Sequence, residues 1–360
     1  MKKFVLSAVL CALALIMRLG VREIPQFADV YADHFNAFWV NSLGRLSSLF
    51  GFSLVEILIY LLIISAVILI VRIIAGNVKL HETGKLYGRD EVLAALLIAS
   101  LIFFLYECNQ DAYFYRTSFA AVYGFGQGSY TTDELKEVCS MLVEKANSLS
   151  ARVPRNDEGI MVCDENVRER ARQAMLILGE KYPYLGGWFP KAKPVLFSQL
   201  LSYSNLTGIY SAYTIEANYN TDMTQYNIPF TMCHELSHLK GVMQENQANF
   251  CAYLACTGTD DADLLYSGYL SAWVYCGNEL YRRDYEAWKE LAGTLDQSCN
   301  RDLKHNNAFW DRHEGKVSEA TESFNDNWLK SHGQTDGTLS YDKVVDLIIS
   351  YEAGKSNDPL

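Results

Sequence analysis

Hydrophobic residues crowd into the first 106 positions of the 360-residue chain, where three long apolar segments follow one another. The segments run over residues 4–21, 53–76 and 91–106. A helix needs roughly 20 apolar residues to cross a bilayer core, so the second segment is long enough, and the third suffices if its ends reach into the interface. The pattern predicts three transmembrane helices within residues 1–106.

The first apolar segment has two interpretations. Lys2 and Lys3 precede a short apolar core, as they do in a cleaved signal peptide. No small-x-small cleavage site precedes Arg18, however, and an arginine near a helix end can extend its head group toward water. We therefore expect an uncleaved membrane anchor.

Residues 22–52 separate the first two apolar segments. Phe35, Phe38 and Trp39 recur there at roughly helical spacing. The pattern predicts an amphipathic helix that lies in the membrane interface. A loop helix packed on the rest of the protein is the alternative.

The pattern changes after position 106. Apolar residues recur at helical spacing in residues 131–153 and 165–183 and again toward the end of the chain. Residues 194–220 are instead rich in Tyr, Thr, Ile and Ser, and their second half predicts one or two strands. We therefore expect a mainly α fold, in which the membrane region 1–106 precedes a mostly helical domain, residues 107–360, with a small β-sheet.

Positive charges set the expected orientation. The short loop between the second and third apolar segments, with its near edge, carries Arg72, Lys79, Lys85 and Arg89. Short basic loops stay in the cytoplasm, so the third crossing places residues 107–360 outside. We expect a multi-pass protein of the bacterial cell membrane, with the lipid bilayer as a partner and an extracytoplasmic C-terminal domain.

The formal net charge of the chain is −11. Binding to nucleic acid relies on clustered Lys and Arg side chains that neutralise phosphates. The charge balance therefore argues against a nucleic-acid partner.

Eight of the nine cysteines lie beyond position 106. An exported domain permits disulfides, and the pairs nearest in sequence are Cys139 with Cys163 and Cys276 with Cys299. Sequence does not determine which cysteines pair. Free, buried thiols are an equal alternative.

The segment "NIPFTMCHELSHLKGVMQENQAN" contains the candidate metal-binding and catalytic residues. His234 and His238 are four residues apart, so on a helix both imidazoles leave the same face. Both nitrogens then reach one zinc ion at roughly 2.0–2.1 Å. Glu235 lies beside them, where it is able to take a proton from a zinc-activated water. Two histidines that do no chemistry are the alternative.

A zinc peptidase needs a third ligand, and two positions compete for it. Gly241 and Gln244 match the metzincin spacing, but glutamine is a poor zinc ligand and no methionine follows Met243 for a methionine turn. Glu245 is the other candidate. It reaches the metal only if Gly241 ends the first helix and a second helix, beginning near Gln244, folds back.

Asn249 lies one helical turn beyond Glu245 and is placed to hydrogen-bond a ligand histidine. His-Glu-x-x-His followed by Glu-x-x-Ala-Asn resembles the gluzincin pattern of HtpX-type and CAAX prenyl-type membrane proteases. Those proteases carry Asp where this chain has Asn249, and their two motifs lie farther apart. The resemblance implies a zincin-like domain in which His234, His238 and Glu245 bind zinc.

The chain also resembles an uncharacterised bacterial membrane-protein family along nearly its whole length. The similar segments are "GFSLVEIL", "GIYSAYTIEAN", "PFTMCHELSHLKG", "ENQANFCAYLAC", "YSGYL" and "NDNWLKSHGQTDGTLSYDKVVDLIISY". This family is a domain of unknown function, so the resemblance implies no known substrate.

We expect a membrane-anchored zinc metalloendopeptidase that hydrolyses peptide bonds of exported or envelope proteins. The alternative is a non-catalytic membrane sensor or envelope-binding module with a structural or vestigial zinc site. Hydrolysis of peptidoglycan cross-links is a third interpretation.

Amide hydrolysis also needs a hydrogen-bond donor to the developing oxyanion. The sequence offers four tyrosine candidates: Tyr210, Tyr213, Tyr266 and Tyr341. The later histidines are scattered in polar stretches, and we expect them at the surface: His305, His313 and His332.

Overall fold

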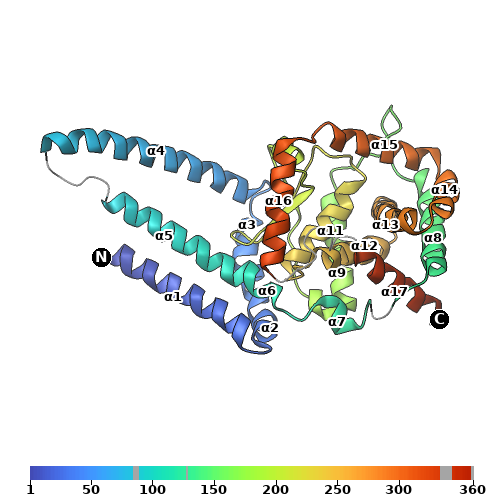
Figure 1. Cartoon of the computed structure of the whole chain (residues 1–360), viewed down its shortest axis with the longest axis horizontal. Helices are drawn as coiled ribbons and strands as arrows, with labels where there is room; N and C mark the ends of the chain where they lie inside the picture. Colours follow the sequence, from blue (N-terminus) through green and yellow to red (C-terminus); the bar gives the residue numbers. More distant parts are fainter. Residues whose placement is uncertain (84–88, 127–128, 333–342, 358–360) are drawn as a thin grey trace. The chain divides into compact units, whose positions relative to one another are not determined.

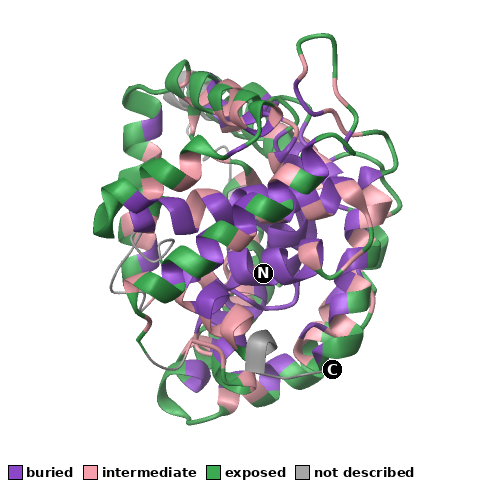
Figure 2. Cartoon of the chain, turned by 90° about the vertical axis from the view of Figure 1, so that its right-hand side faces the viewer, coloured by how far each residue is buried: buried purple, intermediate pink, exposed green. Residues whose placement is uncertain are grey.

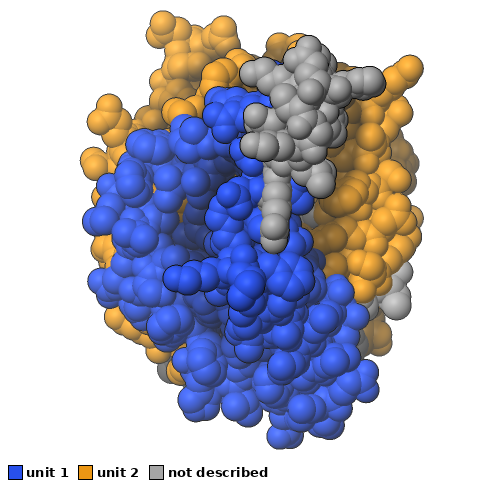
Figure 3. Space-filling view, turned by 90° about the vertical axis from the view of Figure 1, so that its left-hand side faces the viewer, with its two compact units in different colours: residues 1–116, 211–215 blue, residues 117–210, 216–360 orange. Residues whose placement is uncertain are grey.

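The computed structural model describes residues 1–83, 89–126, 129–332 and 343–357. The chain forms two compact units, drawn in blue and orange in Figure 3. Unit 1 comprises residues 1–116 and 211–215, and unit 2 comprises residues 117–210 and 216–360. The protein is mostly helical with one small sheet, as the sequence pattern predicts.

Unit 1 is built from helices, and Figure 1 shows α1 running beside α5. Its α-helices are α1 (Lys2–Glu23), α2 (Phe27–Trp39), α3 (Arg45–Ser47), α4 (Leu54–Thr83), α5 (Arg89–Tyr106) and α6 (Ala112–Phe114). Two π-helical turns join them, η1 (Val40–Gly44) and η2 (Glu107–Asp111).

Three helical stretches within the described residues are long and apolar enough to cross a membrane, which confirms the three predicted segments. They are Lys2–Glu23, Leu54–Arg72 and Asp90–Phe114. The third is longer than the apolar run 91–106, because η2 carries the helix on to Phe114. Lys85, part of the basic loop, lies outside the described residues.

Polar residues hold the end of α1 to the turn that follows α5. Arg18 Nε lies 3.4 Å from Glu107 Oε1, and an Arg22 guanidinium nitrogen lies 3.6 Å from an Asp111 carboxylate oxygen. Both carboxylates are fully buried. Charged groups away from water need partners of opposite charge. The pair with Glu107 therefore explains how the apolar helix α1 accommodates Arg18.

Unit 2 combines helices with a three-stranded sheet of order β1-β3-β2, and α11 packs against β3. The strands are β1 (Lys193–Pro194), β2 (Gly208–Ser211) and β3 (Glu216–Tyr219), with β1 and β3 parallel. The helices are α7 (Phe119–Tyr123), α8 (Thr132–Ser150), α9 (Val167–Lys181), the 3₁₀ turn η3 (Pro183–Leu185), α10 (Ser198–Tyr203), α11 (Asn227–Leu239), α12 (Glu245–Thr257), α13 (Ala262–Arg283), α14 (Tyr285–Gly293), α15 (Gln297–Asp311), α16 (Lys316–Ser331) and α17 (Val344–Asn357).

Helix α11 lies in the interior of unit 2. Every residue of α11 from Ile228 to Leu239 is buried, and α11 packs against α9, α12, α13 and β3. Figure 2 shows the buried residues gathered in the middle helices, with exposed residues on the outside. A fully buried helix carrying two histidines and a glutamate places these polar groups where each needs a partner.

Local sequence explains where helices begin. Thr131 accepts a hydrogen bond from the Glu134 amide, and the Glu134 carboxylate accepts one from the Thr131 amide. This capping box starts α8 at the position that the sequence indicates.

All nine cysteines, each within a described part of the chain, are free. Cys139 and Cys163 do not pair, and neither do Cys276 and Cys299. The structure agrees with the interpretation of buried thiols, since seven of the nine are buried.

Candidate metal centre

The turn between α11 and α12 positions the three candidate ligands. Gly241 adopts a φ of +83°, its amide donates to His238 O (2.9 Å), and the Val242 amide donates to Ser237 O (3.2 Å). These two bonds form a Schellman motif, which ends α11 and favours glycine at the left-handed position. The predicted helix stop at Gly241 is confirmed, and α12 begins at Glu245.

The turn brings Glu245 back onto the two histidines. Nε2 of His234 and Nε2 of His238 lie 3.0 Å apart. Glu245 places Oε2 3.2 Å from His234 Nε2 and Oε1 3.8 Å from His238 Nε2. Ligand atoms held tetrahedrally 2.0–2.1 Å from one ion lie about 3.3 Å from each other. The three side chains therefore have the spacing of ligands that share one ion.

The hydrogen bonds of the two imidazoles show what the site accommodates. His238 Nδ1 donates to Val242 O at 2.6 Å, and His234 Nδ1 donates to Asn249 Oδ1 at 2.8 Å. With Nδ1 carrying the hydrogen, each neutral ring turns the Nε2 lone pair toward the other lone pair and toward the Glu245 carboxylate. Only a cation or a shared proton stabilises three such acceptors together, so these residues fit a metal ion.

The charges of the ligands depend on their surroundings. Burial lowers the pKa of His238 to about 4, against the attraction of Glu245. Burial also acts on His234, but the hydrogen bond and charge of Glu245 outweigh it and raise the pKa of His234 above its ordinary value. Of the two imidazoles, His234 therefore binds a proton more readily than His238.

Glu235 lies next to the ligands without joining them. Its side chain is buried, and its Oε2 has no hydrogen-bond partner within the described part of the chain. Burial raises the pKa of the Glu235 carboxyl to about 8, against the opposing effect of His234. A buried carboxyl with an unused oxygen beside a metal-type cluster is suited to holding and moving a proton.

Strand β2 runs along one side of the site. A β-carbon on Gly208 would lie 2.6 Å from Glu235 Oε1, so this strand face looks onto the glutamate. Tyr210, two residues on, points to the same face, and its ring centroid lies 6.4 Å from that of His238. In sheet order β1-β3-β2, this strand is an edge strand.

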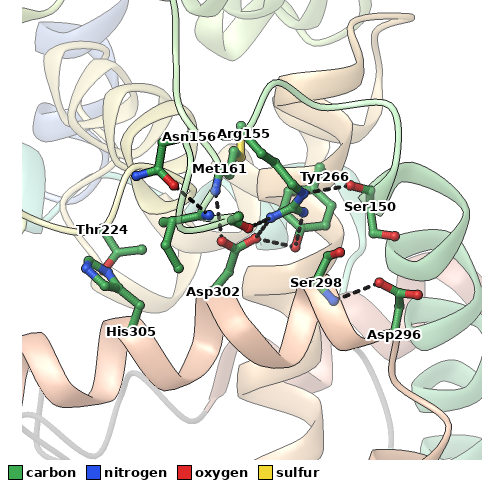
Figure 4. Close-up of polar contacts among 12 residues, drawn as sticks. Ser150, Arg155, Asn156, Met161, Thr224, Tyr266, Asp296, Ser298, Asp302 and His305 are labelled. Atoms are coloured by element: carbon green, nitrogen blue, oxygen red, sulfur yellow. Dashed lines mark hydrogen bonds and ion pairs between the residues drawn. The ribbon is translucent and has the colours of Figure 1, made fainter.

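Among the tyrosine candidates that the structure describes, Tyr210 has a ring near a ligand, His238. Tyr266 is used elsewhere: its hydroxyl donates to Asp302 at 2.6 Å, and Arg155 lies on the same carboxylate (Figure 4). Tyr213 belongs to unit 1, and Tyr341 lies outside the described residues. Tyr266 is therefore not a donor to this site.

The three later histidines make local contacts away from the cluster. His305 Nδ1 bonds Thr224 Oγ1 at 2.8 Å, as Figure 4 shows. His313 Nδ1 donates to Phe309 O, and His332 Nδ1 donates to Trp328 O. None of them is among the described residues that form the metal-type cluster.

Two residues contribute to the site without a functional side chain. Val242 contributes its carbonyl oxygen to His238, which any residue supplies. Gly208 contributes the absence of a side chain. A glycine inside a strand is a sequence signal for a close approach of another group, and Gly208 carries this signal.

No curated protein and no solved structure matches this chain. The family model described as "Protein of unknown function (DUF3810)" matches residues 31–349, which is most of the chain, and the chain therefore belongs to this family.

Proposed function

We propose that this protein is a membrane-anchored, zinc-dependent metalloendopeptidase of gluzincin type. The observation that carries the proposal is the convergence of His234 Nε2, His238 Nε2 and the Glu245 carboxylate next to the buried carboxyl of Glu235. Imidazole nitrogens with one carboxylate are ligands that suit zinc. Similarity to HtpX-type and CAAX prenyl-type proteases rests on the same motif residues.

The number of ligands favours catalysis over a structural role. Structural zinc sites use four protein ligands, whereas catalytic sites use three and leave a position for water or substrate. The described residues supply three at this site. When bound there, zinc would lower the pKa of a water molecule toward neutrality and polarise a carbonyl group.

The residues of the chain have distinct tasks in this proposal. Glu235 takes the proton of the attacking water on its free oxygen and passes it to the leaving amine. Asn249 and the Val242 carbonyl hold the two imidazoles in the tautomer that turns Nε2 to the metal. Tyr210 is the candidate donor to the oxyanion.

A peptide substrate is favoured by strand β2. An extended peptide pairs with an exposed sheet edge through main-chain hydrogen bonds, and β2 is the edge strand beside Glu235. We therefore propose exported or envelope proteins as substrates. We also propose that this domain lies on the extracytoplasmic side of a bacterial cell membrane, which the basic residues between the second and third spans support.

Two variants test the proposal in the full-length protein purified in detergent. Elemental analysis of His234→Ala should show loss of the near-stoichiometric zinc that the parent protein holds, with an unchanged melting temperature for the apo form. Equal zinc in both proteins would exclude the site. Glu235→Gln should keep zinc and lose proteolysis; retained proteolysis, or an unchanged cellular phenotype, would favour the non-catalytic sensor or binding module.

The orientation needs its own test. A C-terminal alkaline phosphatase fusion should be active, because that enzyme folds only outside the cytoplasm, and a C-terminal green fluorescent protein fusion should be dark. The opposite pair of results would place the domain in the cytoplasm.

A further inference from the structure

Residues 194–215 contain no Asp, Glu, Lys or Arg. At the average of 20% charged residues in this chain, about four would be expected in a stretch of this length. The first charged residues on either side, Lys193 and Glu216, are both buried and pair with each other. No charge from the run or its immediate flanks therefore reaches the surface.

Within this run, α10 turns its apolar face outward. Four apolar side chains are more than half exposed: Leu196 (58%), Phe197 (57%), Leu200 (62%) and Tyr203 (52%). Leu200 and Tyr203 are three residues apart on α10, which places them on one side of the helix. Leu196 and Phe197 lie in the turn directly before α10. Tyr203 also meets the ring of His313 edge-on.

The two serines of α10 point inward. Ser198 and Ser202 are buried, and both bind the segment after β3. Ser198 Oγ accepts from the Thr221 amide at 2.9 Å, and Ser202 Oγ donates to an Asp222 carboxylate oxygen at 3.0 Å. Clusters of exposed apolar side chains on a protein surface mark contacts with a membrane or another molecule. The four exposed side chains in this uncharged run therefore indicate that the surface meets something other than water.

The path of the chain points to the bilayer as the partner of that surface. The third membrane span ends at Phe114 and unit 2 begins at Thr117, so only Tyr115 and Arg116 intervene. Three Cα steps reach about 11 Å, so the chain enters unit 2 close to the end of this candidate span. The uncharged run itself ends in residues 211–215, which belong to the unit that contains the spans.

We propose that the apolar face formed by Leu196 and Phe197, just before α10, and by Leu200 and Tyr203 on α10 lies in the headgroup region of the bilayer that anchors the protein. Leucine and phenylalanine side chains enter the boundary between headgroups and acyl chains, and tyrosine is enriched there because its ring is apolar and its hydroxyl is polar. This contact is independent of the metal site and of any catalytic activity.

The test uses the full-length protein in phosphatidylcholine–phosphatidylglycerol vesicles. Leu200→Cys is labelled with the environment-sensitive fluorophore NBD, and quenching is measured with lipids that carry a nitroxide near the headgroup and with aqueous iodide. The matched control is labelled Tyr285→Cys on α14, which is 48% exposed and lies between Asp284 and Glu286. Parent protein treated in the same way gives the background from native cysteines.

We expect about threefold stronger lipid quenching and about threefold weaker iodide quenching at Leu200 than at Tyr285, with a blue-shifted emission. Phe197→Cys on the same face should behave like Leu200→Cys, which guards against a local disturbance at one position. Equal quenching by iodide at Leu200 and Tyr285 would overturn the proposal, because the face would then lie in water. Shielding of Leu200 from both quenchers would also overturn it, because a protein partner or a second copy would then cover the face.

Discussion

Gly208 and Glu235 lie in direct contact: a β-carbon built on Gly208 would come within 2.6 Å of Glu235 Oε1 and 2.8 Å of Asn218 O. The edge strand β2 therefore approaches Glu235 of the HELSH motif so closely that position 208 has room for glycine only. No real β-carbon tolerates such a distance, so any side chain at Gly208 has to displace the carboxylate or the strand.

Gly208→Ala should reduce peptidase activity by about 100-fold, because a displacement near 1 Å at a reacting group has an effect of that order. Zinc content should remain that of the parent protein, since no ligand is touched. Gly293→Ala is the control, because a β-carbon there has open space around it. Full activity in Gly208→Ala would show that the proposed reaction does not need Glu235 to be held against this strand.

Asn249 should control how tightly the metal is held. Its Oδ1 accepts the Nδ1 hydrogen of His234, which orients the ring. Asn249→Ala should weaken zinc binding by about 10- to 100-fold, measured by competition with a chromophoric chelator. Asn249→Asp should bind at least as tightly as the parent protein, because a carboxylate is a stronger acceptor. Weak binding in both variants would mean that residue 249 acts through packing instead.

Zinc affinity should fall with decreasing pH as one proton, not two, competes with the metal. The pKa of His234 is raised by Glu245, so its proton begins to compete already above the ordinary pKa of histidine. The pKa of His238 is lowered to about 4, so His238 stays neutral until the pH approaches that value. Acidification should therefore lower the affinity for zinc. Between pH 6 and 5, the zinc association constant should fall about tenfold per pH unit.

The Glu235→Gln variant is the right background for this titration. A metal ion beside Glu235 favours its ionised form, so the parent protein would release a second proton from a carboxyl whose pKa is about 8. The substitution removes that proton from the measurement. A slope of two in Glu235→Gln would contradict the assignment of different pKa shifts to the two histidines.

Tyr210→Phe should lower kcat by about 100-fold without changing zinc content, the effect of losing one oxyanion donor. The ring of Tyr210 lies near His238 and on the strand face that carries Gly208. Tyr281→Phe is the control, since Tyr281 lies on α13, is 51% exposed and packs against Tyr285 and Trp288. An unchanged kcat in Tyr210→Phe would assign the donor to another group.

Local signals in the sequence predict several parts of this protein. The apolar segments predict the three long helices, and Gly241 predicts the turn because a left-handed φ there favours glycine. Glu245 follows from the distance argument, since a helix that does not turn cannot return a carboxylate to His238. Each of these inferences uses residues close together in sequence.

The remaining features depend on residues that only the fold brings together. Tyr266 and Tyr210 are equivalent candidates in the sequence, but Tyr266 is bound by Asp302 and by Arg155, which is 111 positions away. Likewise, the place of Gly208 against Glu235 depends on which strand takes the edge of the sheet. Helical periodicity does not carry that information.

Asp302 provides the last prediction, on stability. Its fully buried carboxylate accepts hydrogen bonds from Arg155 (2.9 Å), the Tyr266 hydroxyl (2.6 Å) and the Met161 amide (2.9 Å), as Figure 4 shows. Asp302→Asn keeps the volume but leaves the Arg155 charge without its counterion and turns an amide NH₂ toward other donors. We expect a loss of about 3 kcal/mol in the free energy of unfolding.

The matched control is Asp296→Asn, an exposed position on the same helix, where the side chain caps α15 by accepting from the Ser298 amide. Asparagine caps a helix about as well as aspartate, so this variant should change the melting temperature little. For a domain of this size, the loss in Asp302→Asn corresponds to a melting temperature lower by about 6–12 °C, read by circular dichroism. A buried pair that loses one charge should destabilise the fold more than an exposed cap that keeps its hydrogen bond. Equal melting temperatures for the two variants would therefore mean that the Arg155–Asp302 pair contributes no more to stability than the surface cap does.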